Sequence, residues 1–170
     1  MLIKNDVLVA DEWTVLRLRE GETADRVTVP AGKVIVPLPV WNCQHETLQQ
    51  RPELGVWLAS FERAEDIQEE LQRFPVIGVD FHKFTDGRGY TMAYRLRKQM
   101  GYRGELRAMG DILRDQLFLL KRVGFDAFAL RPDKDAHAAL QGFADFSLSY
   151  QASVDTDAPL FRRVTRGESV

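Results

Sequence analysis

The 170-residue sequence contains one cysteine, Cys43, and no long apolar run. A single cysteine excludes an intramolecular disulfide and an iron–sulfur cluster held by cysteines of this chain alone. No stretch approaches the roughly 18 apolar residues that a transmembrane helix needs. The first dozen residues include Lys4, Asp6, Asp11 and Glu12, which is unlike a signal peptide. We therefore expect a cytoplasmic protein that does not enter a membrane.

The common signatures of cofactor and metal binding are also missing. Neither GxGxxG nor GxxxxGK[ST] occurs, so the sequence has no dinucleotide or P-loop fingerprint. The three histidines, His45, His82 and His137, are far apart and show no HxxxH spacing, so we expect no metal site. No serine lies in a GxSxG motif, and no residue stands out as a haem or sirohaem ligand. No cofactor is evident from these patterns, and a non-covalently bound one stays open.

Charge is unevenly distributed along the chain. The net charge is −2, but residues 80–131 contain 11 Lys and Arg against 6 Asp and Glu. This region therefore carries +5, and the remainder carries −7. Such a region could attract a small anion, or it could simply form solvated helix surfaces. The overall acidity argues against a general nucleic-acid-binding protein.

From residue 54 onward, short apolar runs alternate with amphipathic segments at intervals of 21–28 residues. This rhythm is typical of repeated βα units with a largely parallel sheet, so the predicted fold class is α/β. The predicted strands cover 54–60, 76–81, 104–109, 125–130 and 146–151. The predicted helices cover 64–74, 89–100, 111–123 and 134–144, the third beginning at Asp111 as its N-cap.

The first 40 residues differ from this pattern, because they read as β structure throughout. Alternation over 12–20 and two short runs within 25–40 predict strands, and prolines place them at sheet edges or in loops. We expect one domain over residues 1–170. It would comprise a small N-terminal β element (1–40), a βα-repeat core (54–152) and a C-terminal tail (153–170).

Charged residues within two predicted strands bear on the shape of the sheet. Strands buried on both faces of an open sheet usually carry few charges, yet Asp80 and Arg107 interrupt apolar runs. They weakly favour barrel-like curvature. Five strands are too few for a complete eight-stranded barrel. The sheet is therefore expected to be either open or a partial, TIM-like barrel, completed by the N-terminal strands or by a second copy in a homo-oligomer.

The candidate ligand site is the connection that follows the strand 76–81. In parallel α/β folds, ligands bind where strand ends meet helix starts. Glycines could turn backbone N–H groups inward there, and lysine and arginine could bind phosphate, sulfate or sulfite. The alternative is an ordinary turn with solvated charges. The predicted anion-binding residues are Lys83, Asp86, Gly87, Arg88, Gly89 and Arg131.

Three residues are weak candidates for catalysis. Asp80 and Arg107 lie in strands that should be neighbours, so they could form a structural ion pair or a poised carboxylate beside an arginine. His82, at a strand end, could act as an acid or base, or could only form a hydrogen bond.

A possible protein-contact surface lies on the predicted helix 111–123. Phe118 falls on its polar side, near Arg114 and Arg122. An exposed aromatic residue among arginines often marks a protein interface, although scattered exposed apolar residues are also normal.

Three motifs in order, "KFTDGRGY", "GELRAMGDILRDQLF" and "GFDAFALR", resemble the core of a family of uncharacterised bacterial proteins. "VPLPVW", "LGVWLA", "ADFSLSYQ" and "PLFRR" fit the same family, so the resemblance covers most of the chain. The family is described as a probable oxidoreductase of sulfite reduction, and its genes commonly lie beside assimilatory sulfite reductase. A proline is common in the family at the position of His82, which weakens a catalytic role for His82.

The resemblance implies a role near the reduction of sulfite to sulfide, but it assigns no catalytic residues. The missing redox motifs conflict with a literal oxidoreductase, so whether the chain is an enzyme stays open. The favoured interpretation is an accessory protein that acts with sulfite reductase and is non-catalytic alone. The alternative is a small α/β enzyme or binding domain for a sulfur or phosphate oxyanion at the Lys83–Gly89 loop.

Overall fold

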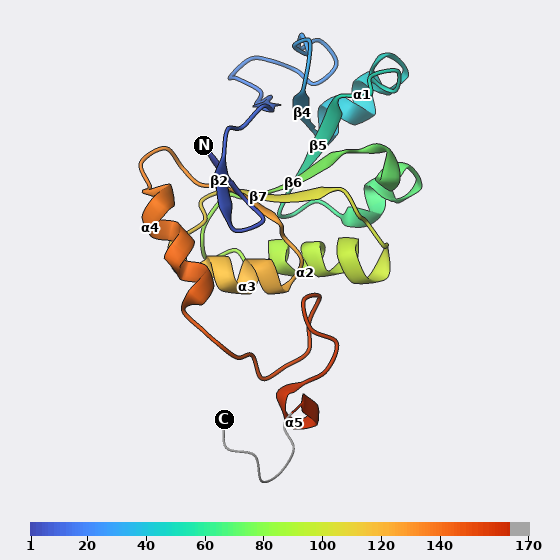
Figure 1. Ribbon diagram of the computed structural model, residues 1–170. Helices are drawn as coiled ribbons and strands as arrows, with labels where there is room; N and C mark the ends of the chain where they lie inside the picture. Colours follow the sequence, from blue (N-terminus) through green and yellow to red (C-terminus); the bar gives the residue numbers. More distant parts are fainter. Residues whose placement is uncertain (164–170) are drawn as a thin grey trace.

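The computed structural model describes residues 1–163, in which eight strands form one mostly parallel sheet (Figure 1). The spatial order is β2-β1-β8-β7-β6-β5-β4-β3. Strands β3 to β8 are parallel to one another, and β1 is antiparallel to both β8 and β2. The strands are β1 (Leu2–Lys4), β2 (Val7–Val9), β3 (Thr14–Val15), β4 (Val34–Pro37), β5 (Leu54–Ala59), β6 (Val76–Phe81), β7 (Glu105–Gly110) and β8 (Ala127–Ala129).

The N-terminal β element is present, but it belongs to the main sheet. Its hairpin, β1 and β2, extends the sheet beyond β8, whereas β3 and β4 extend it beyond β5. Its strands supply both edges of the sheet, which agrees with the expectation of a partial barrel completed by the N-terminal strands.

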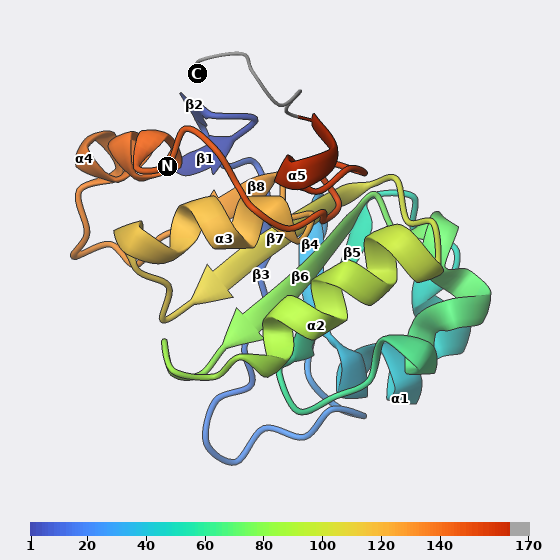
Figure 2. The same ribbon diagram turned by 90° about the horizontal axis from the view of Figure 1, so that it is seen from below.

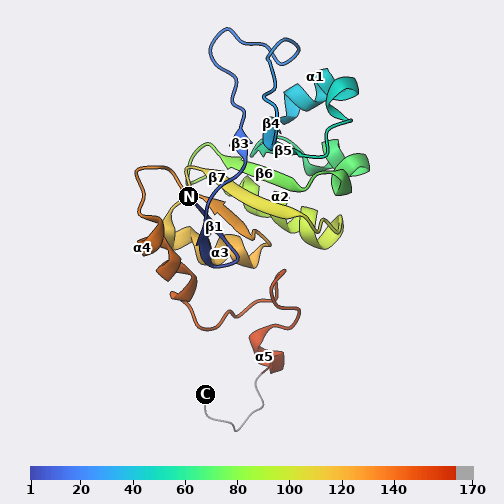
Figure 3. The ribbon, with the colours of Figure 1, turned by 45° about the horizontal axis from the view of Figure 1, so that its top comes forward.

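The short link between β2 and β3 requires the sheet to curl. These strands lie at opposite edges, yet only the four residues 10–13 separate them. A flat sheet of eight strands would place its edges about 33 Å apart. The link can span at most about 18 Å. The sheet is accordingly a curled half-barrel, and Figure 3 shows the chain passing from β1 to β3 across its open face. The barrel-like curvature that Asp80 and Arg107 led us to expect is confirmed as a half-barrel.

Helices cover the convex face of the half-barrel, where α2 and α3 lie side by side (Figures 1 and 2). Alternate strand residues, including Val36, Leu58, Val79, Leu106 and Phe128, join the helices in one apolar core. The α-helices are α1 (Leu38–Leu48), α2 (Arg88–Tyr94), α3 (Leu117–Arg122), α4 (Ala136–Leu140) and α5 (Leu160–Arg163). The 3₁₀ helices are η1 (Ala64–Arg73), η3 (Arg114–Gln116) and η4 (Gln141–Ala144), and η2 (Arg95–Gln99) is a π-helix.

The predicted strand 146–151 is wrong. These residues form no strand, and they run below α3 instead (Figure 1). The reason lies at the sheet edge, because β1 pairs with β8 through Ile3↔Phe128 and Lys4↔Ala127. The position that a strand following β8 would take is occupied by the N-terminus.

The prediction of β structure up to residue 40 fails at α1. The strand β4 ends at Pro37, and Leu38 and Pro39 begin a helix. A proline in the first turn of a helix loses no hydrogen bond, because its missing N–H would have no partner inside the helix. The alternation over 12–20 also predicts too much strand, since only Thr14–Val15 pairs in the sheet.

The predicted helices all exist, with changes in type and start. Segment 64–74 is mostly a 3₁₀ helix, and its expected stripe of Ile67, Leu71 and Phe74 is buried. The helix expected from Asp111 begins at Arg114, because the side chain of Gln116 accepts from the N–H of Leu113.

No helix in the part of the chain that the structure describes is long and apolar enough to cross a bilayer. The last seven residues of the expected tail, 164–170, lie outside the described residues.

Candidate functional site

A cavity of about 680 Å³ lies at the carboxyl ends of β5 and β6. The parallel register Ala59↔Asp80 brings these two strand ends side by side. Five predicted site residues line the cavity: Asp80, His82, Lys83, Asp86 and Arg88. The strand β5 adds Trp57, which the sequence interpretation missed, and Ser60 and Phe61 follow at its end. The cavity therefore lies where ligands bind in parallel α/β folds.

The cation expected to bind an anion, Arg88, is already paired within its own turn. Its Nε and Nη2 donate to the Asp86 carboxylate at 2.9 and 2.7 Å, and its backbone N–H donates at 3.2 Å. Ser60 donates its hydroxyl to the same carboxylate. These bonds, first from Arg88 and then from Ser60, hold the pKa of Asp86 well below its usual range. Asp86 thus occupies the place of an external anion on Arg88.

The glycines of this turn do not form the expected backbone cradle. Neither Gly87 nor Gly89 has a positive φ. A Cβ on Gly89 would lie 2.5 Å from the Phe81 ring, so this glycine allows α2 to approach β6. Within the loop, the N–H of Phe84 donates to Asp111 at 3.2 Å. The polar groups of Asp86, Arg88 and the Phe84 N–H are thus bonded within the protein, while most residues of the turn stay exposed.

Two basic side chains of the cavity keep their polar atoms free. Within residues 1–163, neither His82 nor Lys83 has a side-chain hydrogen bond or ion pair with another residue. Both follow β6 directly and line the cavity. They are the residues best placed to meet a ligand there.

Asp80 pairs with an arginine from the N-terminal loop, not with Arg107. The carboxylate accepts from Arg17 Nη2 at 2.6 Å and Nη1 at 3.2 Å. The same guanidinium lies 5.3 Å from the Trp57 ring, and the indole N–H donates to the carbonyl of Leu16 at 2.9 Å. The expectation of an Asp80–Arg107 ion pair is wrong, because Asp80 faces Met109 in the register of β6 and β7.

Arg107 is fully buried on the concave face in a separate charge cluster. Its Nη1 donates to both carboxylate oxygens of Asp11, at 3.0 and 2.9 Å, and its Nε donates to Glu105 at 2.8 Å. Lys4 pairs with the second oxygen of Glu105 at 2.8 Å. The cluster joins β1, β7 and the link from β2 to β3, so the contacts of Arg107 are structural.

Arg131 does not line the cavity. Its guanidinium donates to Asp111 at 3.2 Å and to Asp133 at 2.9 Å. Since Asp111 also binds the N–H of Phe84, Arg131 reaches the Lys83–Gly89 loop only through this carboxylate. The structure therefore separates Arg131 from the predicted anion-binding set.

The predicted protein-contact residues face the chain's own C-terminal segment. Arg114 pairs with Asp145 at 2.7 Å, Arg122 pairs with Asp155 at 3.3 Å, and Phe118 lies 5.1 Å from Phe146 between ring centroids. These side chains are accordingly not a free surface in the described chain.

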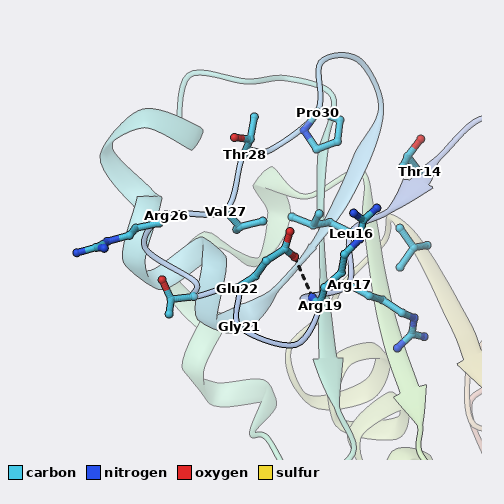
Figure 4. Close-up of a pocket in the computed structure, with 12 residues that line it drawn as sticks. Thr14, Leu16, Arg17, Arg19, Gly21, Glu22, Arg26, Val27, Thr28 and Pro30 are labelled. Carbon is cyan, nitrogen blue, oxygen red and sulfur yellow. Dashed lines mark hydrogen bonds between the residues drawn. The ribbon is translucent and has the colours of Figure 1, made fainter.

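A second cavity, of about 730 Å³, lies in the irregular N-terminal loop (Figure 4). Glu22 accepts from the N–H of Arg19 at 2.8 Å, whereas Arg26 points away from the cavity (Figure 4). Arg17 lines this cavity while its guanidinium binds Asp80. The loop thus positions one wall of the strand-end region, a role that its sequence pattern did not indicate.

The last two features of the region are a carboxyl group with a raised pKa and the lack of a metal-binding cluster in the described residues. Burial raises the pKa of Glu62, whose carboxylate accepts from the N–H of Ala59 at 2.6 Å in the turn after β5. Among residues 1–163, no group of three or more His, Cys, Asp or Glu side chains could hold a metal ion.

A family model described as a bacterial protein of unknown function (DUF934) matches residues 55–161, from β5 to α5. The match includes the cavity and the C-terminal segment but not β1 to β4. No curated protein and no solved structure matches the chain.

Proposed function

The chain belongs to the bacterial family DUF934, and from that premise we propose that it is an accessory protein of assimilatory sulfite reduction. In this proposal it binds sulfite reductase and has no turnover alone. The support for sulfite reduction is the resemblance of the motifs within residues 83–131 to proteins described in that context.

The observation that carries a binding role over a catalytic one is the pairing of the cavity carboxylates. Asp80 is bonded to Arg17, and Asp86 is bonded to Arg88 and Ser60. A general acid or base must be free to exchange a proton with a substrate. Both carboxylates are instead held in charged pairs with arginine, which suits a rigid recognition surface.

Exposed aromatic residues beside the cavity supply a surface for a protein partner. Phe61 lines the cavity and is 69% exposed, and Phe84, in the adjacent loop, is 47% exposed. Aromatic residues are enriched among those that contribute most to protein–protein binding. We propose that this end of the half-barrel contacts the reductase.

Mixing the purified chain with a purified assimilatory sulfite reductase, followed by sedimentation velocity, tests the proposal. We expect a complex at low ionic strength, weakened about tenfold or more by Phe61→Ser if Phe61 acts as a binding hot spot. Val7→Ser is the matched control, since Val7 is 56% exposed on the distant strand β2. Failure to associate at any ionic strength, or turnover of sulfite by the isolated chain, contradicts the proposal.

The free basic residues of the cavity favour a second candidate function, the binding of a small oxyanion. Ligands of (β/α)₈ barrels bind at the carboxyl ends of the strands, and by analogy a TIM-like half-barrel would use the same end. Lys83 and His82 could approach a sulfite, sulfate or phosphate there without breaking an existing ion pair. The pairing of Arg88 with Asp86 makes Lys83 the first residue to test.

Thermal unfolding with sulfite, sulfate and phosphate tests this candidate. A ligand at 100 times its dissociation constant adds about 2.7 kcal/mol to the free energy of unfolding. We expect a selective increase that Lys83→Met removes and that Lys134→Met, an exposed lysine paired with Asp133, preserves. An equal response of both variants would remove Lys83 from the site.

A further inference from the structure

The C-terminal segment 145–157, here the strap, is attached to the helices mainly by charge. Asp145, Asp155 and Asp157 pair with three cations on η2, η3 and α3. In Figures 1 and 2 the segment lies against the outer side of α3, away from the sheet. The cations Lys98, Arg114 and Arg122, with Phe118, are called the basic face.

Arg122 is the centre of this contact. Only 13% of its side chain is exposed, whereas 47% of the Arg114 side chain is exposed. Its guanidinium donates to the carbonyl of Gln151 and pairs with Asp155. Its own carbonyl accepts from the Ser153 hydroxyl at 2.7 Å and from the N–H of Val154 at 3.1 Å.

The apolar side chains of the strap contribute little burial. Phe146 lies 5.1 Å from Phe118 but remains 59% exposed, and Leu148 and Tyr150 are 49% and 66% exposed. The pairs of Lys98 with Asp157 and of Arg114 with Asp145 are more exposed than the Arg122 pair, and exposed ion pairs contribute little to stability and are screened by salt. A segment held in this way can leave its site without unfolding the core.

We propose that the basic face is a docking site for an acidic segment of a partner protein, and that the strap occupies it in the free chain as an intramolecular competitor. The strap itself defines the chemistry of the partner: carboxylates that reach the three cations, with an aromatic ring for Phe118. Arg114, Phe118 and Arg122 are the residues that the sequence marked as a protein contact, and the structure adds Lys98. The inference does not rest on the proposed function, because its test contains no reductase.

The test uses the full chain and a labelled synthetic peptide with the sequence of residues 145–157, followed by fluorescence anisotropy. The strap variant Asp145→Asn/Asp155→Asn/Asp157→Asn keeps the shape of the three side chains and removes their charge. We expect it to bind the peptide about tenfold or more tightly than the wild type, in which the tethered strap competes at high effective concentration. Higher salt should weaken this binding.

Matched controls separate the basic face from general attraction. Adding Arg122→Gln to the strap variant should abolish peptide binding. Adding Arg103→Gln should not, since Arg103 is exposed and has no ion pair within residues 1–163. A peptide with asparagine at the three aspartate positions should bind about tenfold or more weakly, as expected for lost charge complementarity.

Hydrogen exchange in the wild type gives a readout that needs no variant. The Val154 amide, bonded to Arg122, should exchange faster as salt rises, while the amides of β6 and β7 should not change. The proposal is overturned if Val154 exchange is independent of salt. It is also overturned if the strap variant binds the charged and neutral peptides equally, or binds neither. Concentration-dependent dimers of the wild type that the peptide dissociates would assign the face to the strap of a second copy instead.

Discussion

Leu106 and Arg107 are adjacent in β7 and both are fully buried, but they lie in opposite surroundings. Leu106 packs in the apolar core between the convex face of the sheet and the helices. Arg107 lies on the concave face, where Asp11 and Glu105 bind its guanidinium. The convex face is therefore stabilised by apolar packing, whereas the concave face is stabilised by charge pairs and by close packing against Gly78.

The N-terminal segment supplies the charged contacts of the concave face. The link 10–13 crosses it and brings Asp11 to Arg107, while Arg17 from the following loop reaches Asp80. The cavity lies at the end of this face. The N-terminal segment therefore contributes both to the curl of the sheet and to the candidate site. The following predictions test the contrast between the two faces.

Arg107→Met should have the largest effect, about 4 kcal/mol lost from the free energy of unfolding. Removing one partner of a buried ion pair leaves the other charge without compensation, which typically costs about 3–5 kcal/mol. Glu105, whose side chain is 6% exposed, would be the main residue affected, with only Lys4 left as a charged partner. Urea unfolding measures the change, with Arg103→Met as the exposed control.

The double variant Asp11→Asn/Arg107→Met separates the charge cost from packing. If the loss comes from breaking the ion pair, the double variant should lose less unfolding free energy than the two single variants lose together. Strict additivity would mean that Arg107 acts by filling space.

Leu106→Ala should cost about 3 kcal/mol, because it leaves a cavity in the convex core. Leu106→Met should cost less than about 1.5 kcal/mol, since it conserves volume. Methionine should thus cost little unfolding free energy at position 106 but much more at position 107. Equal costs for methionine at both positions would remove the distinction between the faces.

Gly78→Ala should cost about 1–3 kcal/mol through overpacking of the concave face. An added Cβ would lie 2.8 Å from Met109 Sδ and 3.0 Å from Trp57 Cβ. Gly87→Ala is the control, because nothing lies within 4 Å of its Cβ position. Thermal unfolding of both variants measures the difference, and a larger loss for Gly87→Ala would contradict the described packing.

Asp86→Asn, at the rim of the concave face, should produce the smallest effect. We expect it to change how the free energy of unfolding depends on pH. Arg88 and Ser60 lower the pKa of Asp86 well below the usual range of an aspartate. The carboxylate therefore stabilises the fold above about pH 4, and this contribution declines as pH falls through the lower folded-state pKa. Unfolding free energies of the two proteins should converge at acidic pH. A constant difference across the titration would contradict this origin.

Several local features were predictable because they depend on neighbouring residues. The buried runs of β5, β6, β7 and β8 and the helices between them follow the apolar rhythm from residue 54. Gly101 and Gly124 directly follow the predicted helices 89–100 and 111–123, where glycine commonly ends a helix, and both have positive φ, 70° and 112°. The family resemblance, built on motifs within residues 83–131, is confirmed by the match over residues 55–161.

The candidate site was predictable only in part. The rule for strand ends placed His82, Lys83 and Arg88 at a cavity, where the structure also has them. The pattern of charges could not show that Asp86 pairs with Arg88, or that Arg131 binds Asp111. Side-chain partners are chosen by geometry, which residue types and spacing do not specify.

The sequence by itself determined which segments become strands and helices in the βα core, because apolar periodicity and glycine act over a few residues. Tertiary structure decided how the edges of the sheet are filled, which carboxylate each arginine binds, and where the C-terminal segment lies. The Arg17–Asp80 and Asp11–Arg107 pairs join residues 63 and 96 positions apart. Such contacts depend on how the whole sheet brings distant segments together, so no local pattern could indicate them.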